Sequence, residues 1–126
     1  MEKQIYYHDT DCGGVVYYGR YLNYLEEART EYLQERGISV KTIALQGFFF
    51  AVRSCNIVYK SPARYGDILI CNAVLQDQTP AQIVFAQEIK QKDSGKLVAK
   101  AEVALVCLDN SFRPVVIPNQ IKENLR

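Results

Sequence analysis

The sequence of 126 residues has little of the two residue types from which metal sites and disulfide frameworks are built. It contains four cysteines and one histidine, and no two cysteines form a Cys-x-x-Cys pair. This pattern argues against a zinc site and against a small secreted domain held together by disulfides. We therefore expect no metal, reduced thiols and a cytoplasmic protein.

An excess of charge of one sign is also missing. The chain has 15 Lys and Arg residues against 14 Asp and Glu residues, a net charge of +1. A protein that binds nucleic acid by neutralising many phosphates needs a basic excess, and so does one held at an anionic membrane surface. The composition therefore predicts no nucleic-acid partner.

Long apolar runs are absent as well. None approaches the roughly 20 residues that a membrane-spanning helix needs. The N-terminal segment has no apolar core of the kind found in an export signal. We expect no integral membrane contact. There is no repeat, low-complexity segment or linker, so residues 1–126 are predicted to form one domain with a single core.

The N-terminal third predicts one long helix between shorter elements. A short strand is expected over residues 3–8, followed by a glycine-containing loop. Apolar residues then recur at steps of three and four over residues 18–32, and Gly37 is a natural stop. A second, short helix is expected over residues 40–46.

Beyond residue 48 the apolar pattern changes to period two, which is typical of strands. Strands are expected over residues 49–59, 68–75, 83–90 and 97–107. The strand over 68–75 is apolar on both faces and is predicted to be central. Residues 93–96 read as a hairpin turn, and Pro118 as the opening of a short C-terminal helix.

This order predicts an α+β fold. One amphipathic helix would lie against an antiparallel sheet whose last four strands follow in meander order. A parallel sheet would need helices between those strands, and the connections are too short for them.

The loop Asp-Thr-Asp-Cys-Gly-Gly over residues 9–14 carries the chemistry. It places two carboxylates just before the long helix, whose N-terminus presents unpaired N–H groups that can stabilise an oxyanion. A carboxylate in that place can attack a carbonyl or activate water, which suits acyl transfer. Aspartate and glycine are also common there as caps and turns, so this pattern alone leaves a structural role open.

The same loop carries a family resemblance. The sequence over 6–18, with Tyr21-Leu22 and Glu26-Glu27-Ala28-Arg29-Thr30-Glu31, resembles the hotdog-fold thioesterases of the YbgC and 4-hydroxybenzoyl-CoA thioesterase group. The resemblance continues at 50–53 and 61–67 and covers roughly residues 5–118.

The resemblance implies a hotdog fold, with a curved antiparallel sheet wrapped around one long helix. It also implies hydrolysis of a short-chain aliphatic or aromatic, hydroxybenzoyl-type acyl-CoA to the free acid and CoA. Water would be the co-substrate, and no cofactor is implied, CoA being part of the substrate. Homodimers joined edge to edge, often paired into homotetramers, would share active sites at the interface.

By the same resemblance, Asp11 is the catalytic carboxylate, acting as nucleophile or as general base. The backbone N–H of Tyr18 would polarise the thioester carbonyl. The family often has histidine at that position, so only the backbone role carries over here. Asp9 is expected to orient the loop. The expected substrate-binding residues are Tyr7, Gly13, Gly14, Val15, Val16 and Tyr17.

Phosphates of CoA need cations, and Lys60, Arg64 and Lys90 are the candidates, although each also reads as a solvated surface charge. Some members of the group carry a basic cluster where residues 77–82 stand here, which leaves acyl carrier protein open as an alternative thiol carrier. A non-catalytic ligand-binding or interaction module is a further alternative. A dehydratase pairs histidine with carboxylate, and the lone His8 sits in the wrong segment for it.

Overall fold

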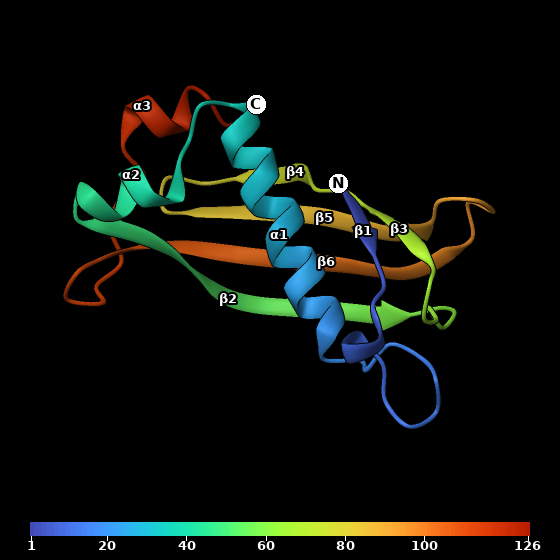
Figure 1. Cartoon of the computed structure of the whole chain (residues 1–126). Helices are drawn as coiled ribbons and strands as arrows, with labels where there is room; N and C mark the ends of the chain where they lie inside the picture. Colours follow the sequence, from blue (N-terminus) through green and yellow to red (C-terminus); the bar gives the residue numbers. More distant parts are fainter.

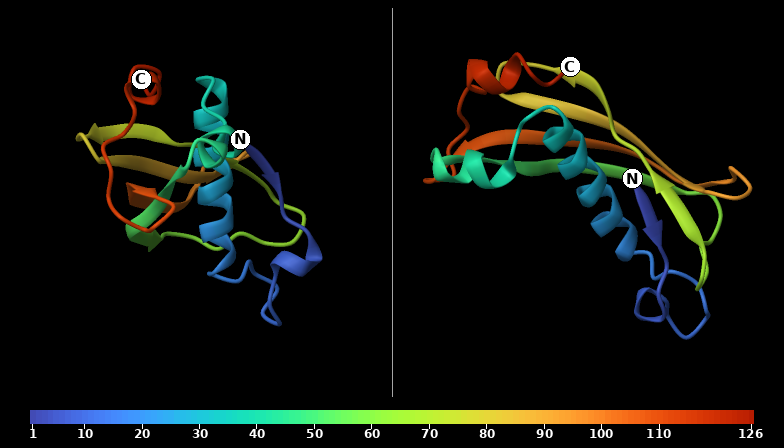
Figure 2. Two further views of the ribbon diagram at one scale, coloured as in Figure 1. Left: turned by 90° about the vertical axis from the view of Figure 1, so that its left-hand side faces the viewer. Right: turned by 45° about the horizontal axis from the view of Figure 1, so that its top comes forward.

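A long helix, α1 (Arg20–Glu35), lies across one face of a curved antiparallel sheet in the computed structural model, which describes residues 1–126 (Figure 1). The six strands are β1 (Glu2–Gln4), β2 (Phe48–Tyr59), β3 (Ile68–Cys71), β4 (Val74–Gln78), β5 (Gln82–Gln91) and β6 (Leu97–Asp109). A 3-10 helix, η1 (Tyr7–Asp9), precedes α1, and α2 (Val40–Leu45) and α3 (Asn119–Lys122) are short. The α+β prediction is confirmed, and two further views show how strongly the sheet curves (Figure 2).

The predicted meander order is wrong. The strands lie in the order β1-β3-β5-β6-β2, and β4 pairs with β5 beside this path. Strand β2 therefore pairs with the last strand and forms one edge of the sheet. A period-two pattern shows which side chains share a face, but it does not name the partner strand. The two longest strands, of 12 and 13 residues, pair with each other.

The predicted central strand over 68–75 is also wrong, because it divides into β3 and β4 at Asn72. The Asn72 side-chain oxygen accepts the Glu88 N–H at 2.8 Å, and its backbone N–H donates to the Glu88 carbonyl at 3.0 Å. These bonds satisfy backbone groups where the ladder breaks. Of these two pieces, only β3 has a strand on each side, β1 and β5.

Two other predicted boundaries change near the N-terminus. The first strand ends at Gln4, and His8 lies in η1 rather than at a strand end. Helix α1 begins at Arg20, so Tyr18 is in the turn before it and is 63% exposed instead of buried. The short helices near 40–46 and after Pro118, and the hairpin between β5 and β6, are confirmed.

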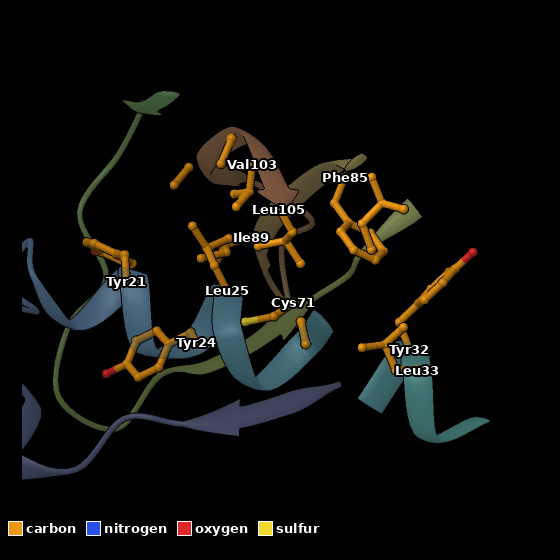
Figure 3. Packing of buried hydrophobic residues seen from close by; sticks show 14 of the residues in the cluster. Tyr21, Tyr24, Leu25, Tyr32, Leu33, Cys71, Phe85, Ile89, Val103 and Leu105 are labelled. Carbon is orange, nitrogen blue, oxygen red and sulfur yellow. The ribbon is translucent and has the colours of Figure 1, made fainter. Parts of the chain in front are cut away.

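The core lies between α1 and the sheet. The predicted helical stripe is buried at Tyr21, Leu25, Ala28 and Tyr32 and packs on side chains of β5 and β6 (Figure 3). Burial of each such large side chain stabilises the fold by about 1.5–3 kcal/mol. No helix is long and apolar enough to cross a membrane. The packing fixes the axis of α1, and its N-terminus lies beside the end of β2, where Tyr18 and Tyr21 contact Tyr59.

Candidate active site

The loop that joins η1 to α1 is a narrow turn closed at its base. Thr10 and Val16 form an antiparallel bridge, and the Asp11 N–H donates to the Val15 carbonyl at 3.0 Å. The Gly14 N–H donates back to the Asp11 carbonyl at 3.0 Å, and Gly14 has φ of +77°, which favours glycine. The turn holds Asp11 at its first position, and the loop extends beyond the sheet below the start of α1 (Figure 1).

The Asp11 side chain is exposed and has one oxygen engaged. Its Oδ1 accepts the Gly13 N–H at 2.8 Å, and no basic side chain forms an ion pair with it. A Cβ at position 13 would lie 3.2 Å from that oxygen, so glycine leaves room for the carboxylate. The second oxygen is therefore free to meet a substrate or a water molecule.

The start of α1 presents unpaired N–H groups. The Tyr17 carbonyl accepts the Arg20 N–H at 2.8 Å, and the Tyr18 carbonyl accepts the Tyr21 N–H at 3.3 Å. The N–H groups of Tyr18 and Gly19 have no acceptor within the chain. These are the orphan donors of a helix N-terminus, at the positive end of the helix dipole. Such a position stabilises an oxygen that develops negative charge.

A second carboxylate, Asp9, lies behind the loop. It is only 3% exposed. Its Oδ2 accepts the Tyr6 N–H at 2.9 Å, and its carbonyl accepts the Tyr17 N–H at 3.0 Å. Its Oδ1 lies 4.0 Å from Nε of Arg20 and 3.8 Å from Nε2 of His8. Burial and then this carboxylate raise the pKa of Tyr24, which keeps that phenol neutral.

Tyrosines line the space beside the helix start. A groove of about 300 Å³ is lined by Val16, Tyr18, Tyr21, Tyr59, Lys60, Ser61 and Pro62. The Tyr59 hydroxyl donates to the Tyr18 carbonyl at 3.3 Å, and the Tyr59 and Tyr21 rings lie 5.5 Å apart. Burial raises the pKa of both of these phenols. The groove thus offers apolar ring faces and neutral hydroxyls next to the free Tyr18 N–H.

Most of the predicted site residues lie on one continuous piece of structure. Gly13, Gly14, Val15 and Val16 share the loop with Asp11, and Tyr17 leads into the helix start. Tyr7 lies in η1, is 81% exposed, and makes an edge-to-face contact with Tyr65 at 6.1 Å. Arg64 bridges to Val15, which brings that cation to the loop, and Lys60 lines the groove.

Lys90, the third candidate cation, lies apart from this loop and groove within the single chain. Ile89 is fully buried beneath α1, and neighbouring residues of a strand point to opposite faces. Lys90 is therefore on the other face of the sheet, where its Nζ lies 3.7 Å from Glu88.

The sequence analysis missed two contributors to the site, Tyr59 and Arg20. Tyr59 was placed on a strand face, and only the packing of β2 beside the helix start brings it to Tyr18. Arg20 follows the tyrosines at the helix start, and no spacing rule pairs it with Asp9.

Most of the chain matches one family of enzymes. Residues 6–125 match the family model described as thioesterase-like superfamily. The chain belongs to the thioesterase-like superfamily. The resemblance found in the sequence is confirmed, and so are the hotdog fold and the expectation of a thioester hydrolase.

Individual thioesterases of this superfamily cover most of the chain. An acyl-CoA thioesterase YbgC of Haemophilus influenzae is 35% identical over 121 residues, which are 94% of this chain and 88% of that protein. The 1,4-dihydroxy-2-naphthoyl-CoA thioesterase structure from Synechocystis superposes with a TM-score of 0.91 at 27% identity, covering 99% and 93% of the two chains.

A relative that uses a different thiol carrier is also similar. A chloroplastic acyl-acyl carrier protein thioesterase of Arabidopsis thaliana is 30% identical over 122 residues, which are 97% of this chain and 64% of that protein. Members of the superfamily with similar sequences are thus named for both thiol carriers.

Proposed function

We propose that this thioesterase hydrolyses acyl-CoA, with Asp11 as nucleophile or general base and the Tyr18 N–H polarising the thioester carbonyl. The observation that carries the proposal is the unpaired N–H of Tyr18 at the start of α1, next to a loop that presents a free carboxylate. The Haemophilus and Synechocystis relatives, both named for CoA thioesters, support CoA as the thiol carrier.

The reaction follows from these two groups. The thioester oxygen accepts the Tyr18 N–H, so negative charge that develops on it lies at the positive end of the helix. One such donor contributes roughly 3 kcal/mol in the transition state. Either Asp11 attacks the carbonyl and water then releases the acyl group, or Asp11 takes a proton from the attacking water. In both routes CoA leaves as the thiol, and no cofactor takes part.

The groove and its rim supply substrate contacts in this proposal. The acyl group, short aliphatic or aromatic, would lie against Tyr7, Tyr17 and the backbone of residues 13–16. Lys60 and Arg64 would bind phosphates of CoA, since both lie beside the loop and the groove.

A second copy of the chain would complete the assembly. Strand β2 is a 12-residue edge strand, and pairing it with a second β2 would cover its open hydrogen-bonding edge. We therefore propose a homodimer that can pair again into a homotetramer. The four cysteines are all free, which fits a reducing compartment such as the cytoplasm.

Hydrolysis of a panel of acyl-CoA thioesters by the unmodified protein and by Asp11→Asn tests the proposal. The panel runs from short aliphatic to aromatic acyl groups, and released thiol is measured. We expect Asp11→Asn to lower kcat by about 10²- to 10⁴-fold with the fold unchanged. Asp109→Asn is the matched control, since Asp109 lies in a turn at the end of β6. We expect this variant to keep full activity. Turnover that does not depend on Asp11 would rule out this mechanism.

The similarity to a carrier-protein thioesterase favours one second candidate. The same panel therefore includes acyl groups on acyl carrier protein. A kcat/KM that is higher for the protein-bound acyl group would transfer the assignment to that carrier. A protein that hydrolyses neither class would instead be a ligand-binding or interaction module.

A further inference from the structure

One buried residue, Asp9, contacts both ends of the loop that carries Asp11, through its carboxylate at one end and its backbone carbonyl at the other. Its Oδ2 accepts the N–H of Tyr6, before the loop, at 2.9 Å. Its carbonyl accepts the N–H of Tyr17, after the loop, at 3.0 Å. The Thr10 and Val16 bridge follows directly inside this pair. Through these bonds, Asp9 closes the base of the turn. Asp11 lies in that turn, two residues after Asp9.

Asp9 also ties the loop to the helix that supplies the Tyr18 N–H. Arg20 lies in the first turn of α1, where the helix dipole disfavours a cation. Its Nε is 4.0 Å from Oδ1 of Asp9, so the carboxylate offsets that charge. The dipole itself favours an anion at this place. A carboxylate that is 3% exposed needs such partners, because burying a charge without them is strongly unfavourable.

Burial separates the roles of the two aspartates. Asp9 is enclosed and has both carboxylate oxygens facing protein groups, whereas Asp11 is exposed with one oxygen free. A thioester therefore reaches Asp11 and does not reach Asp9. What Asp9 controls is the placement of Asp11 against the start of α1.

The geometry points to Asp9 as a positioning residue for thioester hydrolysis, which sets the distance between the Asp11 carboxylate and the Tyr18 N–H by joining Tyr6, Tyr17 and Arg20. This inference rests on the proposed function. Asp9 would raise kcat by holding Asp11 in place, and Asp9 itself would not touch the substrate.

Steady-state kinetics of Asp9→Ala and Asp9→Asn test the assignment, with Asp109→Ala as the matched control. Asp109 is also an aspartate that accepts backbone N–H groups in a turn, but it lies at the end of β6. A displacement of about 1 Å in a reacting group can lower the rate about a hundredfold. We expect Asp9→Ala to lower kcat by about that factor with KM nearly unchanged. Asp9→Asn retains an acceptor for the Tyr6 N–H and recovers part of the loss.

Combination with Asp11→Asn separates positioning from a general loss of structure. Groups that act as a unit have non-additive effects on kcat. In the Asp11→Asn background, Asp9→Ala should therefore lower the residual rate by only a few-fold. A full loss in that background, or a loss no larger than that of Asp109→Ala, would overturn the assignment.

Amide hydrogen exchange gives a readout that does not depend on turnover. Asp9→Ala should speed exchange at the N–H groups of Asp11 and Gly14, which bond within the turn, and leave the middle of α1 protected. Asp109→Ala should change neither. The proposed function fails if the unmodified protein hydrolyses no thioester. Independently, the role of Asp9 is overturned if Asp9→Ala leaves hydrogen exchange in the turn unchanged. If Asp9→Ala does not fold, hydrogen exchange is measured on Asp9→Asn instead.

Discussion

Two of the exposed turns that are built on an aspartate differ in their surroundings, and one of these two lies beside a helix start. At the end of β6, Oδ1 of Asp109 accepts the N–H groups of Ser111 and Arg113, at 2.8 and 3.0 Å. In the loop before α1, Oδ1 of Asp11 accepts only the Gly13 N–H, at 2.8 Å. The same side chain is thus used for turn stability in one place and left partly free in the other.

The residue with positive φ in each turn shows the same contrast. Phe112, in the Asp109 turn, has φ of +62° and packs edge-to-face on Phe49 with ring centroids 5.6 Å apart. Gly14, in the Asp11 turn, has φ of +77° and no atom within 4 Å of where a Cβ would lie. One turn is closed by side-chain packing, and the other is open. An aspartate in a turn therefore does not make a site by itself; the open space and the unpaired N–H beside Asp11 distinguish its turn.

Among the changes that test this contrast, removal of that N–H is expected to have the largest effect. Tyr18→Pro deletes a donor that has no partner in the chain, in the turn before α1, so no backbone hydrogen bond is lost. Stability should therefore change little, while kcat falls by about 10²- to 10³-fold, as for other oxyanion donors. Thiol release and thermal unfolding measure the two quantities.

Tyr18→Ala is the control for this change, because it removes the ring and keeps the N–H. It should retain most of kcat, and a loss as large as that of the proline variant would assign the effect to the ring. If the unmodified protein, Tyr18→Pro and Tyr18→Ala were equally active, the unpaired N–H would not distinguish the Asp11 turn as a site.

A smaller effect is expected from stiffening the open turn. Gly14→Ala forces an ordinary residue into the left-handed region and should lower the free energy of unfolding by about 1 kcal/mol. Gly95, in the β5–β6 hairpin, has φ of +72° and equally open space. Gly95→Ala should give the same destabilisation in urea unfolding, but only Gly14→Ala should also lower kcat. Matched losses of kcat would show that the position of the strain is unimportant.

The smallest effect concerns stability alone. Asp109→Ala removes a side chain that accepts two backbone N–H groups and should destabilise the protein by about 1–2 kcal/mol. Asp11→Ala removes one such bond at an exposed site and should destabilise it by about half as much. Urea unfolding checks the ranking, and a larger loss at Asp11 would mean that its carboxylate holds the turn rather than serving the reaction.

Much of the site was predictable because it is local in sequence. Asp11, the two glycines and the tyrosines before α1 lie within one stretch, and the stripe from Tyr21 to Tyr32 follows the helical period. Strand alternation places Lys90 on the face away from α1. The predicted order of strands was wrong because period two does not specify partners.

Local patterns in the chain specify the helix, the period-two segments and the loop that places a carboxylate before a helix N-terminus, since each depends on residues close together in sequence. Three other features follow from the packing of the chain as a whole: β2 is an edge strand, Tyr59 contacts Tyr18, and Asp9 is buried near Arg20. Those contacts depend on which strands pair and how α1 lies across them, and packing of the whole core settles both.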